Sequence, residues 1–295
     1  MTRLKAGFLN MMADKAFVVS ERHFATLLGA DDGRNVDLVR LTFGEIPRGP
    51  AVAAHIERHY RSAAAVDPRH LDVLVISGAN VSDPLLRQQV FWEPLCRLFD
   101  WAAEADLPVL CSCLATHAVL EARHGERRRR VVPKVWGVFP HQAVVADHPL
   151  MQGLPASVPV PHSRHNDVAA EQFSRAGYEV LLASDQAGVH LAVERTRGRW
   201  LLLQGHPEYE AVSLLKEYKR EVLRWQSGEC TDYPPLPQGY LRKEGCRIAS
   251  RFAEACQAGR SEDVFPEGKL LSHVECRWTG AAVKVVGNWL EGLGG

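Results

Sequence analysis

The sequence predicts an α/β fold, in which a mostly parallel sheet is flanked by helices and followed by a C-terminal extension. Short apolar runs bounded by turn residues indicate buried strands, and the amphipathic segments between them have the length of helices. The chain has 295 residues, 46% of them hydrophobic and 24% charged. That is enough for one large α/β domain with a substantial core.

Strands and helices alternate along the first three quarters of the chain. Strands are predicted at Lys5–Leu9, Val36–Leu41, Leu71–Ser77, Pro108–Cys111, Tyr178–Ala183, Val189–Glu194 and Trp200–Gln204. Helices are predicted at Ser20–Leu28, Ala51–Ala65, Gln88–Ala105, Leu114–His124 and Glu210–Ser227. This alternation is typical of a parallel sheet built from strand–helix–strand units.

The composition changes beyond residue 228. The chain is first proline-rich, in TDYPPLPQGY, then polar and helical, and finally apolar again. The apolar end contains Trp278 and Trp289, whose exposure would be unfavourable. We therefore expect a catalytic domain over residues 1–228 and an extension over residues 229–295 that packs back on it.

The charge balance argues against a polyanionic partner. Thirty-five basic and thirty-five acidic residues give a formal net charge of zero, so no global field attracts nucleic acid or an anionic membrane. No apolar run reaches the roughly 18 residues of a membrane span, and the first residues do not form a signal peptide. We expect a cytoplasmic protein with small-molecule partners, no nucleic acid and no membrane.

The cysteines and histidines do not predict a metal site. Seven scattered cysteines indicate reduced thiols rather than a disulfide framework. The close pair Cys111 and Cys113 lacks the second half of a zinc site. His162 and His165 are three apart, but neighbouring Pro and Ser residues favour a loop there. We expect no metal and no bound cofactor.

Cys113 is the candidate nucleophile. In LPVLCSCLATHAVL it follows an apolar run and precedes a predicted helix, which is the arrangement of a nucleophile elbow. Such a turn needs small neighbours two positions away, and Cys111 and Ala115 meet that need. The helix N-terminus favours a thiolate and presents backbone N–H groups to an oxyanion. The alternative is a buried core cysteine, a role that suits Cys111 inside its apolar strand.

His206 and Glu208 are the candidate base and its acidic partner. They follow a predicted strand in WLLLQGHPEYE, and Pro207 stiffens the spacing between them. A thiol that attacks a carbonyl needs a base, and the base needs an acid to fix its tautomer and stabilise the imidazolium. A solvated surface turn is the alternative interpretation of this segment.

The elbow and the His-Pro-Glu turn together resemble the class I glutamine amidotransferase superfamily, with its flavodoxin-like fold and its Cys, His, Glu triad. The rest of the chain is similar to the homoserine O-succinyltransferase and O-acetyltransferase family. Matches in the correct order run from about residue 4 to residue 290, through FLNMMADK, ISGANV, FWEPLCRLFDW, PKVWGVFPH, PHSRHND, QGHPEYEAVSLLKEYKREV and RWTGAAVKVVGNWL.

This resemblance implies an acyl-CoA-dependent O-acyltransferase that works by a ping-pong mechanism. Cys113 matches the acyl-carrying nucleophile, His206 the general base and Glu208 its partner. The co-substrate would be succinyl-CoA or acetyl-CoA, and the acceptor L-homoserine, in the first step of methionine biosynthesis from homoserine. Family members are usually dimers, so a homodimer is expected.

The resemblance also implies oxyanion donors and substrate contacts. The oxyanion donors would be backbone amides near Gly78, Ala79 and Leu114. The substrate contacts would be Arg220, Lys134, Ser163 and Lys15, with Ser163, Arg164 and His165 forming a loop that lines the active site. For Arg220, Lys15 and the loop, surface or capping roles are the alternative.

Three local features bear on substrate choice. Ser82 stands where the family distinguishes acyl donors by a glutamate or a glycine, and its small neutral side chain does not repel a succinyl carboxylate, so we favour succinyl-CoA. Ala281 replaces a family histidine, and the longer N-terminal arm of typical members is missing. Either change bears on dimer packing or on the acceptor pocket.

The run Glu126–Arg130, ERRRR, is interpreted as a solvated loop. A site for the phosphates of CoA is the alternative, because arginines bind anions in dense clusters. Three other functions stay open: an acyltransferase for serine or a related hydroxy amino acid, a glutamine amidotransferase-like amidase, and a non-catalytic relative.

Overall fold

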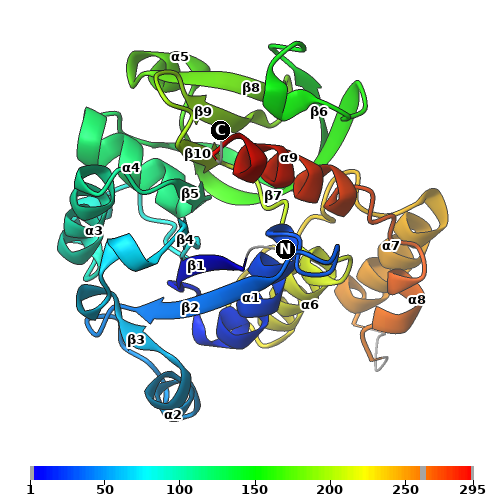
Figure 1. Ribbon diagram of the computed structural model, residues 1–295. Coiled ribbons are helices and arrows are strands. Elements are labelled where there is room, and N and C mark those ends of the chain that lie inside the picture. The colour runs from blue at the N-terminus through cyan, green and yellow to red at the C-terminus, as the bar shows by residue number, and fades with distance from the viewer. Residues whose placement is uncertain (1–2, 260–263, 294–295) are drawn as a thin grey trace.

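The computed structural model describes residues 3–259 and 264–293, whose strands form one ten-stranded sheet (Figure 1). The strand order is β3-β2-β1-β4-β5-β10-β9-β8-β6-β7. The bounds are β1 Leu4–Leu9, β2 Val36–Thr42, β3 Arg61–Ser62, β4 Val73–Ile76, β5 Val109–Ser112, β6 Arg129–Ala143, β7 Ser157–Asp167, β8 Tyr178–Ser184, β9 Gly188–Glu194 and β10 Trp200–Leu203.

Helices cover the sheet. Their bounds are α1 Asp14–Leu27, α2 Pro50–His59, α3 Trp92–Glu104, α4 Leu114–His124, α5 Ala170–Arg175, α6 Ser213–Gln226, α7 Lys243–Gln257, α8 Glu267–Leu271 and α9 Thr279–Gly292. Over the described ranges, none of these helices combines the length and apolar character needed to cross a bilayer.

The two faces of the sheet support two separate cores. Successive side chains of a strand point to opposite faces, so β4 contributes to both. Leu74 and Ile76 pack with α3 and α4 on one face, while Val73 and Val75 pack with α1 and α9 on the other. The predicted α/β fold with helices flanking the sheet is therefore confirmed.

The sheet has a parallel half and an antiparallel half. Strands β3, β2, β1, β4, β5 and β10 run parallel to one another, and β9, β8, β6 and β7 continue the sheet with antiparallel pairs. Each strand predicted from an apolar run is present. The carboxyl ends of β5 and β10 therefore lie side by side, since these strands are parallel neighbours.

The prediction of a loop around His162 is wrong. His162 and His165 lie in β7, which pairs along its length with β6. Strand β7 is at the edge of the sheet, where proline is tolerated because one side of the strand needs no ladder hydrogen bonds. Pro159 and Pro161 therefore signal an edge strand here and not a loop.

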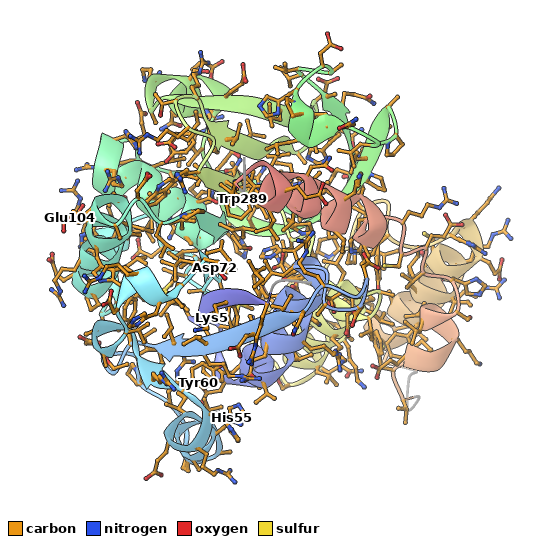
Figure 2. The ribbon with its side chains drawn as sticks, viewed as in Figure 1. Lys5, His55, Tyr60, Asp72, Glu104 and Trp289 are labelled. Atoms are coloured by element: carbon orange, nitrogen blue, oxygen red, sulfur yellow. The ribbon has the colours of Figure 1, made fainter. Side chains whose placement is uncertain are left out.

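The C-terminal residues pack in two places. Helices α7 and α8 lie together beside α6, and α9 returns across the sheet (Figure 1). Trp278 and Trp289 are buried, and Trp289 (Figure 2) donates a hydrogen bond to the carbonyl of Gly198 at 2.8 Å. Helix α6, which precedes residue 228, shares one core with α7 and α8, which follow it. The domain boundary at residue 228 therefore stays a prediction.

Candidate active site

Cys113 occupies the turn between β5 and α4 with φ 49° and ψ −106°. This backbone conformation is strained for any residue other than glycine. It persists only where several surrounding contacts hold the residue in place. The Cys113 N–H donates to the carbonyl of Leu203 at 2.7 Å, which ties the turn to the end of β10. The structure thus places Cys113 at a strained strand–helix turn, the geometry of an elbow.

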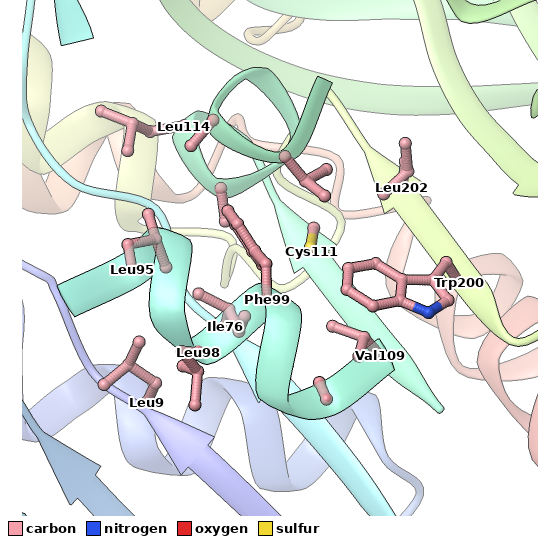
Figure 3. Close-up of a cluster of buried hydrophobic side chains, with 14 of the residues drawn as sticks. Leu9, Ile76, Leu95, Leu98, Phe99, Val109, Cys111, Leu114, Trp200 and Leu202 are labelled. Carbon is pink, nitrogen blue, oxygen red and sulfur yellow. The ribbon is translucent and has the colours of Figure 1, made fainter. Parts of the chain in front are cut away.

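The rival thiol, Cys111, is enclosed in the core. It is 0% exposed, and Figure 3 shows it among side chains that include Phe99 and Leu202. Burial raises the pKa of Cys111, which disfavours the thiolate. Cys113 is only half-buried, so it is the thiol of this pair that a substrate can reach.

His206 and Glu208 form a buried pair beside Cys113. Nδ1 of His206 lies 2.9 Å from Oε1 of Glu208. The backbone N–H of His206 donates a hydrogen bond to the carbonyl of Pro161 at 2.7 Å. Burial lowers the pKa of His206, but the nearby Cys113 and Glu208 outweigh burial and raise that pKa well above its usual value. The ring can therefore carry a proton beside the Cys113 sulfur.

The backbone around Gly78 closes the other side of the turn. A Cβ placed on Gly78 would lie 3.4 Å from Cβ of Cys113 and 3.8 Å from the backbone nitrogen of Leu114. Gly78 is buried and Ala79 half-buried. The Gly78 backbone and the backbone nitrogen of Leu114 thus both lie next to Cys113.

Glu217 gathers several of the candidate substrate residues. It accepts hydrogen bonds from the Tyr209 hydroxyl at 2.7 Å, the Trp136 indole at 3.0 Å and the Ser163 hydroxyl at 2.5 Å. Its carboxylate also lies 3.6 Å from the Lys134 ammonium. The sequence analysis missed Glu217, although it stands on the apolar face of α6 between Leu214 and Tyr218, where a carboxylate needs partners.

Tyr209 connects this group to the base. Its ring stacks on His206, with centroids 4.4 Å apart. Burial lowers the pKa of Lys134, whose ammonium lies over the Trp136 ring at 4.3 Å. Lys134 and Ser163 therefore lie on one polar surface that begins at His206.

Arg220 and Lys15 lie at the periphery. Arg220 is on the exposed side of α6, where its Nε donates to Glu221 at 3.1 Å, and its charge contributes to lowering the pKa of Lys134. Lys15 is exposed in the first turn of α1. Its charge contributes to lowering the pKa of Glu229, which lies beyond the end of α6. Among the described residues, no hydrogen bond or ion pair joins Lys15 to the catalytic group.

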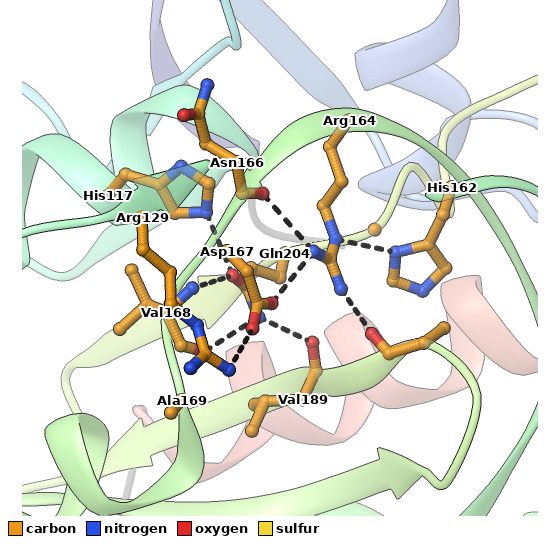
Figure 4. Close-up of polar contacts among 12 residues, drawn as sticks. His117, Arg129, His162, Arg164, Asn166, Asp167, Val168, Ala169, Val189 and Gln204 are labelled. Atoms are coloured by element: carbon orange, nitrogen blue, oxygen red, sulfur yellow. Dashed lines mark hydrogen bonds and ion pairs between the residues drawn. The ribbon is translucent and has the colours of Figure 1, made fainter. Parts of the chain in front are cut away.

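Arg164 is buried in β7 and fully engaged. Its guanidinium donates to Asp167 at 2.7 Å, to the carbonyl of Asn166 at 3.2 Å, to the carbonyl of Ala187 and to Nδ1 of His162 at 3.3 Å (Figure 4). The residues assigned by resemblance to a substrate-lining loop therefore belong to a strand, and Arg164 is enclosed within it.

A cluster of neutral histidines supports the end of β10. Nε2 of His141 lies 3.2 Å from Nε2 of His162, and Nδ1 of His190 accepts from the N–H of Gly205 at 3.3 Å. Burial lowers the pKa of His141 to about 4 and holds those of His162 and His190 well below the usual value. Where the chain is described, no group of three metal-ligating side chains has the geometry of a metal site.

The basic run at Glu126–Arg130 is not uniformly solvated. Arg128 is 6% exposed and donates to the carbonyls of Val81 at 3.1 Å and of Asp83. The interpretation of the run as a solvated loop is therefore wrong at Arg128, because its buried guanidinium donates hydrogen bonds to backbone carbonyls.

Ser82 lies in the segment that this basic run holds. Its carbonyl accepts hydrogen bonds from Arg130 at 2.9 Å and from the Asn166 amide at 3.0 Å, while its side chain is exposed. The backbone of the candidate acyl-specificity residue is therefore fixed from two strands.

Comparison with known proteins identifies the family. A family model described as homoserine O-succinyltransferase matches residues 1–293. The homoserine O-succinyltransferases of Thioalkalivibrio nitratireducens and Allochromatium vinosum are each 44% identical to this chain over 292 residues, covering 97% of it and 82% of the relative. The chain belongs to the homoserine O-succinyltransferase family. It is therefore an acyltransferase.

Solved structures place the homoserine O-succinyltransferase family within a wider fold. A glutamine amidotransferase from Thermotoga maritima aligns with a TM-score of 0.56 at 12% identity, over 99% of this chain and 100% of that one. A glutamine amido transferase from Methylobacillus flagellatus aligns with 0.53 at 14% identity, over 99% and 95%. These likenesses confirm the amidotransferase-like fold that the resemblance implies.

Ala281, the position where the resemblance implies a histidine, lies in the first turn of α9. It lines a small cavity with His190 and Pro207, next to the turn that carries His206. Ala281 therefore lies next to the turn of the candidate base, on the side of the buried His190.

Proposed function

We propose that this chain transfers a succinyl group from succinyl-CoA to the hydroxyl of L-homoserine, through a thioester on Cys113. The observation that carries the proposal is the strained Cys113 turn beside the His206–Glu208 pair, in a chain of this family. The product, O-succinylhomoserine, starts methionine biosynthesis from homoserine.

The first half-reaction acylates Cys113. The thiolate attacks the thioester carbonyl of succinyl-CoA, and the amides near Gly78 and Leu114 stabilise the oxyanion. The bond from carbonyl to CoA sulfur breaks, and His206, protonated beside Cys113, gives its proton to the leaving thiolate. The enzyme is left with a neutral His206 and an acyl group on sulfur.

The second half-reaction transfers the acyl group. His206 removes the proton from the homoserine hydroxyl, the oxygen attacks the thioester carbonyl, and the bond to Cys113 sulfur breaks to regenerate the thiolate. Glu208 keeps Nδ1 of the ring occupied, so that the other nitrogen faces the reacting oxygen.

The polar surface around Glu217 is the proposed acceptor site. Arg220 would bind the homoserine carboxylate, since a guanidinium matches a carboxylate with two parallel hydrogen bonds. Lys134 and Ser163 lie on the same surface as His206 through Tyr209. Lys15, which is exposed in the first turn of α1, is a proposed contact of the bound substrates.

The test measures free CoA thiol released from succinyl-CoA or acetyl-CoA, each with homoserine or serine. We expect the fastest release with succinyl-CoA and homoserine. Mass spectrometry without acceptor should show one succinyl group on Cys113. Ammonia release from glutamine without CoA release from either donor would instead indicate an amidase.

A further inference from the structure

Within residues 3–259 and 264–293, Arg128 is a buried cation without a carboxylate partner. It lies between α4 and β6 and is 6% exposed, although its neighbours Arg127 and Arg129 are exposed. Among the described residues, no carboxylate oxygen lies within 4.0 Å of its guanidinium; the nearby Glu121 pairs with Arg87 at 2.9 Å and with Arg127 at 3.7 Å. A buried charge normally has such a partner, because removing an ion from water is costly.

Backbone carbonyls satisfy only part of Arg128. Nη2 donates to Val81 at 3.1 Å and to Asp83, and Nε reaches Pro84 at 3.4 Å. Nη1 has no hydrogen-bond partner within the described part of the chain, and it is not sealed from solvent. Nη1 is thus the donor nitrogen left free to bind a further group.

Arg164 shows what a fully engaged arginine looks like in the same region. It is 4% exposed, and each of its three nitrogens donates to the protein, with Asp167 supplying the counter-charge at 2.7 Å. Both guanidiniums lie within electrostatic reach of Cys113. Of these two cations near the nucleophile, Arg128 is the one still able to take an anion.

The segment that Arg128 holds leads directly to the nucleophile. Gly78 adjoins Cβ of Cys113, and three residues later Val81 accepts from Arg128. Ser82, between the two carbonyls that Arg128 binds, carries no charge. An acyl chain that starts on the Cys113 sulfur and follows this segment would therefore run toward the Arg128 guanidinium.

We propose that Arg128 binds the free carboxylate of the acyl group while that group is carried on Cys113, and so selects a dicarboxylic donor. This specificity role rests on the proposed acyl transfer through Cys113. No covalent bond to Arg128 forms or breaks. Nη1 donates a charge-assisted hydrogen bond to the carboxylate, and this bond replaces hydrogen bonds from both groups to water.

The experiment compares acylation of Cys113 by succinyl-CoA and by 4-oxopentanoyl-CoA, in which a methyl ketone replaces the carboxylate. We expect the wild-type protein to prefer succinyl-CoA by at least about tenfold in rate, the usual loss when one charge-assisted hydrogen bond is removed. Arg128→Met should bring the ratio of the two rates close to one, and Arg128→Lys should leave an intermediate ratio.

Arg130→Met is the matched control, since Arg130 is exposed but also holds this segment, through Ser82. It should leave the ratio as in the wild type. A wild-type ratio near one, or a ratio unchanged in Arg128→Met, overturns the inference. If Arg128→Met does not fold, the comparison of the wild-type ratio with the Arg128→Lys ratio tests the inference, and equal ratios overturn it. If the wild type releases no CoA from any donor, acyl transfer itself has failed.

Discussion

The two halves of the sheet differ in what they bury. The strands of the parallel half bury almost only apolar side chains. Strand β5 ends directly before Cys113, and β10 ends three residues before His206. The antiparallel half buries imidazoles and a guanidinium, with His141 on β6 and Arg164 on β7. The parallel half thus positions the proposed reacting groups, whereas the antiparallel half contributes buried polar side chains.

Replacing the nucleophile should have the largest effect. We expect Cys113→Ala to lower the rate of acyl transfer by at least about 10⁴-fold, as loss of a triad nucleophile does elsewhere. Cys111→Ala is the matched control two residues away, and it should keep most of its activity because Cys111 only packs. Thiol-release kinetics of both variants test this, and equal losses would remove the distinction between turn and strand.

Breaking the buried ion pair of the antiparallel half should have the next largest effect, on stability. Arg164→Met leaves Asp167 buried without its closest partner, so we expect a loss of about 3–5 kcal/mol in the free energy of unfolding. Denaturant unfolding measures it. Arg129→Ala removes an exposed partner 3.6 Å from the same carboxylate and should cost less than about 1 kcal/mol; equal losses would mean that Arg164 is not specially placed.

The parallel half could be predicted from the sequence because its strands are continuous apolar runs. The Cys113 turn and the His206–Glu208 pair follow such runs directly, so their positions in the fold could be inferred. The same alternation predicted α3, α4 and α6.

The antiparallel half could not be predicted in the same way. Strands β6 and β7 contain prolines, histidines and arginines, a composition typical of loops, and their pairing is set by contacts between distant residues. The roles of Glu217 and Arg128 depend on partners from other elements, such as Tyr209 and Val81. A sequence pattern does not show these partners.

Removing the acid of the pair should change the proton affinity of the base. Cys113 and Glu208 raise the pKa of His206, so Glu208→Gln should lower it by at least about one pH unit, or about 1.4 kcal/mol. A raised folded pKa stabilises the protein below the unfolded value near 6.5, and that contribution is lost as pH rises through the folded pKa.

The stability difference between wild type and Glu208→Gln should therefore shrink as pH rises from the folded pKa of His206 in the variant to its higher folded pKa in the wild type. NMR titration of His206 and unfolding at several pH values measure both effects. Cys113→Ala serves as a second variant, because it removes the other charge that raises this pKa. An unchanged His206 pKa in both variants would show that the pair is not coupled to the nucleophile.

The smallest expected effect separates the two half-reactions. Glu217→Gln keeps the shape of the side chain that gathers Lys134 and Ser163 but removes its charge, so we expect acceptor turnover to fall by about fivefold, or about 1 kcal/mol. Acylation of Cys113 by the donor should be unchanged, because Glu217 lies on the acceptor side of His206. Glu229→Gln, with a largely exposed carboxylate at the end of α6, should change neither rate. Equal slowing of both half-reactions in Glu217→Gln would mean that its cluster supports the whole catalytic centre rather than the acceptor alone.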